Sequence, residues 1–162
     1  MNHTHRKNIY ERFSEIKKGF LQKRAINTQT CLSEKEIRAF EKKYKIILPL
    51  SYRMYIKFLS NGDNNPALVF PLNHKSVVEK GVFSFTGKRI SAHCLRPIFR
   101  VPGTMLIADA GCTFCYLMVV RGRRYGSIWH YDFDWEWENE ECYPLHWRAD
   151  NFFDWYECRL NN

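Results

Sequence analysis

The spacing of apolar residues in the first third of the chain predicts three helices. The first helix has apolar residues at spacings of four, three and four along one side: Ile9, Phe13, Ile16 and Phe20. The second begins after Ser33, because Ser33 and Glu36 have the spacing of a capping box. Its buried positions are Ile37, Phe40 and Tyr44.

A third helix is predicted to begin at Pro49, because proline favours the first turn of a helix. The apolar positions of this helix are Tyr52, Tyr55, Ile56 and Leu59. Asn61 and Gly62 can adopt the left-handed conformation that ends a helix. Two short helices joined by the sequence KIILP are therefore expected.

After residue 62 the pattern changes to short apolar runs between turn residues, which predicts strands. The runs cover residues 68–70, 82–85, 105–108, 116–120 and 127–133. Residues 121–126 are predicted to form a hairpin between the last two runs, with the charges of Arg121, Arg123 and Arg124 exposed.

Asp150 is predicted to cap a last helix. The apolar residues of that helix that need burial are Phe152, Phe153, Trp155, Tyr156 and Leu160. The order of helices, strands and one final helix predicts an α+β fold with an antiparallel-rich sheet.

The charge distribution divides the chain into a basic front and an acidic end. The 162 residues carry a formal net charge of +8 and have the length of one domain. Residues 1–57 contain 14 Lys and Arg against 5 Asp and Glu, whereas residues 132–162 contain 2 against 9. The net charge therefore hides two regions of opposite sign.

The location of the protein is predicted from what the sequence lacks. No apolar run approaches the roughly 20 residues of a membrane-spanning helix. The first ten residues have no apolar stretch typical of a secretory signal. We therefore expect a cytoplasmic protein whose six cysteines are reduced thiols.

Several segments resemble the SUKH superfamily. The segment LSEKEIRAFEKKYKIILPLSYRMYIKFLSNGD is similar to its opening helices, with a Lys-Tyr-x-Ile-x-Leu-Pro connection and a terminal Asn-Gly. The segments GTMLIADAGC, CYLMVV, YGSIWHYDFDW and NFFDWYECRL are similar to its central strands and final helix. The resemblance covers residues 32–160. In residues 109–115 only Gly111 matches the glycine-rich and acidic stretch of many members.

The resemblance implies both a fold and a function. The implied fold is a central antiparallel-rich β-sheet with N-terminal helices and a C-terminal helix packed on it. Residues 31–162 would form this domain, and residues 1–30 would be a basic helical extension outside the common core. The implied function is a non-enzymatic bacterial immunity protein that binds and neutralises a co-encoded toxin, often a nuclease. Other members are eukaryotic regulatory and scaffolding domains.

The segment from Asp132 to Glu138 is the predicted partner-binding site. In an extended strand its acidic residues point to one side and its aromatic residues to the other. The acidic face could occupy the basic groove of a toxin that binds nucleic acid. Trp side chains often dominate interface energies. The candidate residues are Asp132, Asp134, Trp135, Glu136, Trp137 and Glu138. The simpler interpretation is a solvated acidic face over a core of aromatic residues.

Other chemistry has weaker support in the sequence. Carboxylates that alternate along a strand are about 7 Å apart, a spacing more typical of surface charge than of a magnesium site. Cys112 and Cys115 form a C-x-x-C motif, but it lacks the second pair of a zinc site and precedes a strand instead of opening a helix. We therefore expect buried thiols, no metal, no cofactor and no catalytic residues.

The basic first helix leaves a second function open. Its Lys and Arg residues could contact phosphate or an anionic membrane surface, or could simply be solvated. No recognition-helix or ribonucleoprotein signature accompanies them, so we do not expect sequence-specific binding to nucleic acid. The alternative function is a regulatory protein-interaction module of the same fold.

Overall fold

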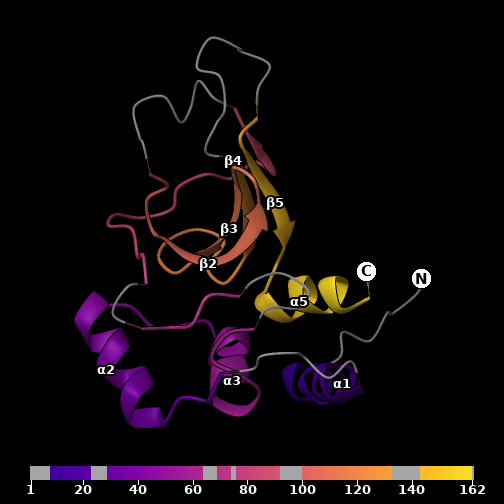
Figure 1. The fold of residues 1–162 in the computed structure, drawn as a ribbon. Coiled ribbons are helices and arrows are strands. Elements are labelled where there is room, and N and C mark those ends of the chain that lie inside the picture. The colour runs from indigo at the N-terminus through magenta and orange to yellow at the C-terminus, as the bar shows by residue number, and fades with distance from the viewer. Residues whose placement is uncertain are drawn as a thin grey trace.

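The described part of the chain forms four α-helices and a five-stranded antiparallel sheet (Figure 1). The computed structural model describes residues 8–22, 29–63, 69–73, 76–91, 100–132 and 143–161. The helices are α1 (Ile9–Gln22), α2 (Glu34–Tyr44), α3 (Leu50–Phe58) and α5 (Phe152–Leu160). The strands are β1 (Arg89–Ile90), β2 (Thr104–Gly111), β3 (Phe114–Val119), β4 (Ile128–Asp132) and β5 (Leu145–Ala149). The predicted α+β class, with N-terminal helices and a C-terminal helix packed on a sheet, is confirmed.

Local sequence signals set the helix ends. The Ser33 hydroxyl accepts a hydrogen bond from the Glu36 amide, and the Glu36 carboxylate accepts one from the Ser33 amide, so the predicted capping box is present. Pro49 is the N-cap of α3, and Gly62 has a φ of 106°. The prediction that Asp150 caps the last helix is wrong. Asn151 caps α5, because its side chain is the one that reaches the Asp154 amide.

The sheet has the strand order β1-β5-β4-β3-β2, and every neighbouring pair is antiparallel. Residues 121–126 join β3 to β4, as predicted for a hairpin. Bridges to Val69 and Val78 cover part of the outer edge of β2. Those contacts reduce the number of free main-chain groups on that edge strand.

The strand prediction for residues 82–85 is wrong, and β1 and β5 were not predicted. Phe83 forms a single bridge to Gly122 and is fully buried. The packing there is very close, because a Cβ at Gly103 would lie 2.5 Å from the Phe83 nitrogen and one at Gly122 would lie 2.4 Å from the Phe83 oxygen. Both glycines also have positive φ. Only residues without a side chain fit here.

Each face of the sheet carries its own cluster of buried apolar residues. The first cluster lies between sheet and helices and includes Met105, Ile107 and Met118 from the strands. The second cluster, on the opposite face, is formed mainly by Phe83, Ile90, Val101, Cys115, Leu117, Val119, Trp129, Tyr131 and Leu145. The sheet is therefore the middle layer of the domain.

Helix α1 packs on the domain through the stripe that the sequence predicts. Ile16 and Phe20 belong to the first cluster, and Phe13 packs against Phe153 with ring centroids 5.9 Å apart. Figure 1 shows α1 beside α5, and residues of the two helices are in contact. Arg12 adds ion pairs to Asp154 and Glu157 of α5, the latter at 2.8 Å. Part of the basic front therefore pairs with the acidic end of the same chain.

Two of the three arginines in the hairpin are less exposed than the sequence predicts, and both form hydrogen bonds. Arg121 is half-buried and donates hydrogen bonds to the carbonyl oxygens of Glu79, at 3.1 Å, and Tyr44. Arg124 is half-buried too and donates to the carbonyl oxygen of Thr86 at 3.2 Å. The expectation of exposed charge holds only for Arg123.

Candidate partner-binding site

The predicted acidic segment begins at the last residue of β4. Asp132 is half-buried, and its carboxylate accepts a hydrogen bond from the Thr113 hydroxyl at 3.1 Å. Its amide donates to the Pro144 carbonyl at 2.9 Å. The other predicted site residues lie outside the described residues: Asp134, Trp135, Glu136, Trp137 and Glu138. The structure thus shows that the chain leaves the sheet after Asp132, the last residue of β4, and enters it again at Leu145, the first residue of β5.

The alternation of buried and half-buried side chains along β4 agrees with the prediction up to Asp132. Trp129 and Tyr131 are buried in the second cluster, whereas His130 and Asp132 lie on the other face and are half-buried. Because side chains alternate along a strand, Asp132 and His130 share the helix side of the sheet. The continuation of the pattern beyond Asp132 remains a prediction.

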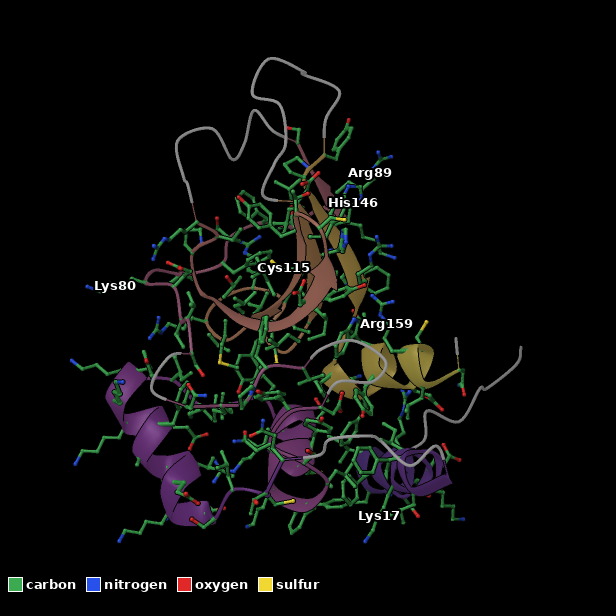
Figure 2. All side chains as sticks on the ribbon, viewed as in Figure 1. Lys17, Lys80, Arg89, Cys115, His146 and Arg159 are labelled. Carbon is green, nitrogen blue, oxygen red and sulfur yellow. The ribbon has the colours of Figure 1, made fainter. Side chains whose placement is uncertain are left out.

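Four strands contribute one row of side chains to this face. Arg89 of β1 pairs with His146 of β5, which pairs with His130 of β4, which pairs with Tyr116 of β3. Directly paired residues of antiparallel strands project on the same face with Cβ atoms about 5 Å apart. Figure 2 shows Arg89, His146 and Arg159 following one another along β5 toward α5.

Aromatic contacts hold this row together. The His130 ring stacks on Phe114 with centroids 4.9 Å apart and an interplanar angle of 21°. It also lies 5.4 Å from the Tyr116 ring. Arg159 of α5 sits over Tyr116, with its guanidinium carbon 4.8 Å from the ring centroid, and donates a hydrogen bond to the Tyr116 hydroxyl. The row therefore continues from the sheet onto α5.

We call this surface the cationic face and define it by the following residues: Arg89, Phe114, Tyr116, His130, His146, Arg148 and Arg159. Burial, followed by the positive charge of Arg148, lowers the pKa of both His130 and His146. Because the pKa of each imidazole falls below its ordinary 6.5, both rings are mainly neutral at pH 7. The arginines supply the positive charge of the face at that pH.

Sequence reasoning missed the cationic face, although part of the signal was present. The sequence Leu-His-Trp-Arg-Ala of residues 145–149 alternates apolar and polar residues, which is typical of a half-buried strand. Recognising β5 would have placed His146 and Arg148 on one face. No local pattern could have paired His146 with Arg89 or His130, because strand register determines those neighbours.

The C-x-x-C motif does not form a paired thiol site. Cys115 is buried in the second cluster as expected, and burial raises the pKa of its thiol to about 12. Cys112 is exposed in the turn between β2 and β3, so the expectation of burial is wrong for it. Within the described ranges, no three His, Cys, Asp or Glu residues are grouped as metal ligands would be.

The helices and sheet together define the class of protein. A capped helix pair, one antiparallel sheet and a C-terminal helix that returns to the first helices form an α+β domain. The chain belongs to the SMI1 / KNR4 family (SUKH-1), whose family model matches residues 31–158. This family is known for immunity proteins and is generally non-catalytic.

Two other comparisons add no relatives. Neither the curated proteins nor the solved structures include a match to this chain. Among the described helices, none has the length and apolar composition needed to cross a membrane.

Proposed function

We propose that this protein is a bacterial immunity protein that binds and neutralises a cognate toxin in the cytoplasm without catalysis. The observation that carries the proposal is membership of the SUKH-1 family over residues 31–158. Family members of this kind act on a protein partner, and they are generally non-catalytic. The toxin is of the polymorphic or contact-dependent class, and a nuclease fits the charge of the segment proposed to bind it.

We place toxin binding on the segment that begins at Asp132. A nuclease needs a basic groove for its substrate, and an acidic segment can occupy such a groove by charge complementarity. Asp132 supports this placement, because the end of β4 holds it at the rim of the sheet. The acids Asp134, Glu136 and Glu138 would then face the toxin, with Trp135 and Trp137 at the margin.

Co-expression with the toxin encoded beside this gene tests the proposal. The wild-type chain is expected to rescue growth and to co-purify with the toxin. The double variant Asp134→Lys with Glu136→Lys is expected to lose protection and weaken toxin binding about a hundredfold or more, because it places positive charge against a basic groove.

A matched control separates a local effect from one of net charge. Glu15→Lys with Asp150→Lys makes the same charge change at two exposed positions elsewhere. This control is expected to bind toxin like the wild type. Unchanged toxin affinity in the Asp134 and Glu136 variant would remove the acidic segment as the binding site. If wild type neither rescues growth nor co-purifies, the immunity function itself is wrong.

The exposed side of α1 supports a second candidate function. Lys17 and Lys18 are exposed, and Tyr10 and Leu21 on the same helix are 66% and 64% exposed. Figure 2 shows Lys17 at the outer side of α1. A regulatory interaction module could use this basic and apolar surface to contact nucleic acid or an anionic membrane. Such binding would weaken steeply with added salt, whereas a mixed aromatic and acidic interface would weaken less.

A further inference from the structure

We propose that the cationic face binds a carboxylate group on a protein partner, next to the acidic segment. The proposal deepens the function proposed above and rests on it for its biological role. It assigns a second contact of opposite sign to the same end of the sheet. The partner surface would then carry both a basic patch and a neighbouring carboxylate.

The first support is the charge of the face. Arg89, Arg148 and Arg159 bring three guanidinium groups to it, and Asp132 at the rim brings one carboxylate. Among the residues that the structure describes, no carboxylate forms an ion pair with any of these arginines. By contrast, Arg12, Arg38 and Arg53 are each paired with an acidic side chain. The cationic face therefore retains positive charge that a ligand could neutralise.

The second support is accessibility combined with fixed geometry. Arg89 and Arg148 are exposed, His130 and His146 are half-buried, and Phe114 is 36% exposed. Arg89 is held over the Tyr143 ring, with its guanidinium carbon 4.3 Å from the centroid. An arginine that is already positioned loses less conformational freedom when it binds. Its planar guanidinium can donate two parallel hydrogen bonds to a carboxylate.

The sequence beside the face favours a protein carboxylate over a nucleic acid. The chain leaves the sheet after Asp132 and returns at Leu145, and the intervening sequence includes five acids. Because Asp132 and Leu145 fix both ends of this acidic sequence in β4 and β5, its negative charge disfavours a polyanion as the ligand. The row is four strands wide, which is about 15 Å at the usual strand spacing. A single side chain on a folded partner fits within that width.

Titration with two matched small ligands tests the proposal without the toxin. The probe is a capped tripeptide of phenylalanine between two glutamates, and the comparator is a thymidine trinucleotide. Amide and imidazole NMR signals of the full chain are followed up to about 10 mM ligand, because contacts of this size give weak affinities. We expect the tripeptide to shift the signals of His130, His146 and Arg148 in a saturable manner.

Paired charge variants test where the tripeptide binds. Arg89→Glu with Arg148→Glu should weaken its binding about tenfold or more, because two donors are lost and two repulsive charges are added. Lys17→Glu with Lys18→Glu makes the same charge change on α1 and should alter binding less than about twofold. If the first variant misfolds, Arg148→Ala takes its place, with about threefold weaker binding expected.

Three outcomes would overturn the proposal. The tripeptide could produce no saturable shifts, or shifts centred away from the cationic face. Both charge variants could weaken tripeptide binding equally, which would show a general charge effect. The trinucleotide could bind the same residues more tightly, which would make the face a nucleic-acid site. Because these measurements omit the toxin, their failure leaves the immunity function untouched, and loss of toxin rescue leaves a positive titration intact.

Discussion

At the scale of single residues, Asp63 is the buried polar centre of the helical layer. Its Oδ2 atom accepts hydrogen bonds from the hydroxyls of Tyr55 on α3 and Tyr156 on α5, the latter at 2.6 Å. Asp63 is only 2% exposed. Burial, and then the charge of neighbouring groups including Asp63, raises the pKa of both tyrosines, so both remain donors. One carboxylate thereby links helices separated by about ninety residues of sequence.

Removing one of the two tyrosine hydroxyls that donate to Asp63 should lower the stability of the protein. Tyr156→Phe is expected to reduce the free energy of unfolding by about 1 to 3 kcal/mol, because Asp63 loses a buried hydrogen bond. Tyr125→Phe is the matched control, since Tyr125 is 47% exposed and donates to the Ile47 carbonyl at 2.9 Å. The control should lose about 0.5 kcal/mol or less, because water can replace its partner. Urea unfolding measures both, and equal losses would contradict a buried role for Tyr156.

At the scale of elements, ion pairs join α2 to α3. Glu41 of α2 accepts hydrogen bonds from Arg53 of α3, at 2.6 Å, and from the Leu48 amide, at 2.9 Å. Glu34 is paired with Arg53, with Lys57 at 2.9 Å and with Arg38 at 2.8 Å. Hydrogen bonds from Lys57 and Arg38 lower the pKa of Glu34 to about 2. These contacts join the two helices that KIILP connects.

The lowered pKa of Glu34 predicts a change in stability with pH. Its ordinary pKa is 4.5, so its contribution is complete above pH 4.5 and is lost as the pH falls through about 2. Glu34→Gln should therefore lower the urea midpoint at pH 7, and the difference from wild type should shrink between pH 4.5 and 2. Asp150→Asn removes an exposed acid outside this group of ion pairs and serves as the control. A difference that stays constant with pH would contradict the role of the Glu34 charge.

At the scale of the whole molecule, the helical layer and the sheet share one core. Ile16 of α1, Phe152 of α5 and Met118 of β3 belong to the same cluster of buried residues. The family model begins at residue 31, so α1 precedes the matched region but packs against it. The division into a 1–30 extension and a 31–162 domain stays a prediction about folding units.

The shared core predicts that α1 unfolds together with the sheet. Ile16 is 2% exposed, so Ile16→Ala should lower the free energy of unfolding by about 2 to 4 kcal/mol. Circular dichroism and tryptophan fluorescence should report the same single transition, because Trp129 lies in the sheet. Leu21→Ala, at a position 64% exposed, should change stability by about 0.5 kcal/mol or less. An early helical transition that fluorescence does not detect would instead make α1 an independent unit.

Helices were predictable here because their signals are local. The capping box of Ser33 and Glu36 and the stripe of α1 each lie within a few turns of one helix. The strand prediction failed at residues 82–85, where Phe83 is buried through close packing on Gly122 and forms only one bridge. An apolar run indicates burial, but ladder pairing also depends on which strands lie alongside.

The sequence by itself determined the α+β class, the helical layer, the hairpin at residues 121–126 and the acidic run after β4. Each depends on residues close together in the chain, whose spacing gives periodicity, caps and turns. Only the tertiary structure decided that Arg89, His146, His130 and Tyr116 form one row and that Arg12 pairs with α5. Strand register and helix docking bring those residues together from distant positions, and the free energy that selects them comes from the whole core.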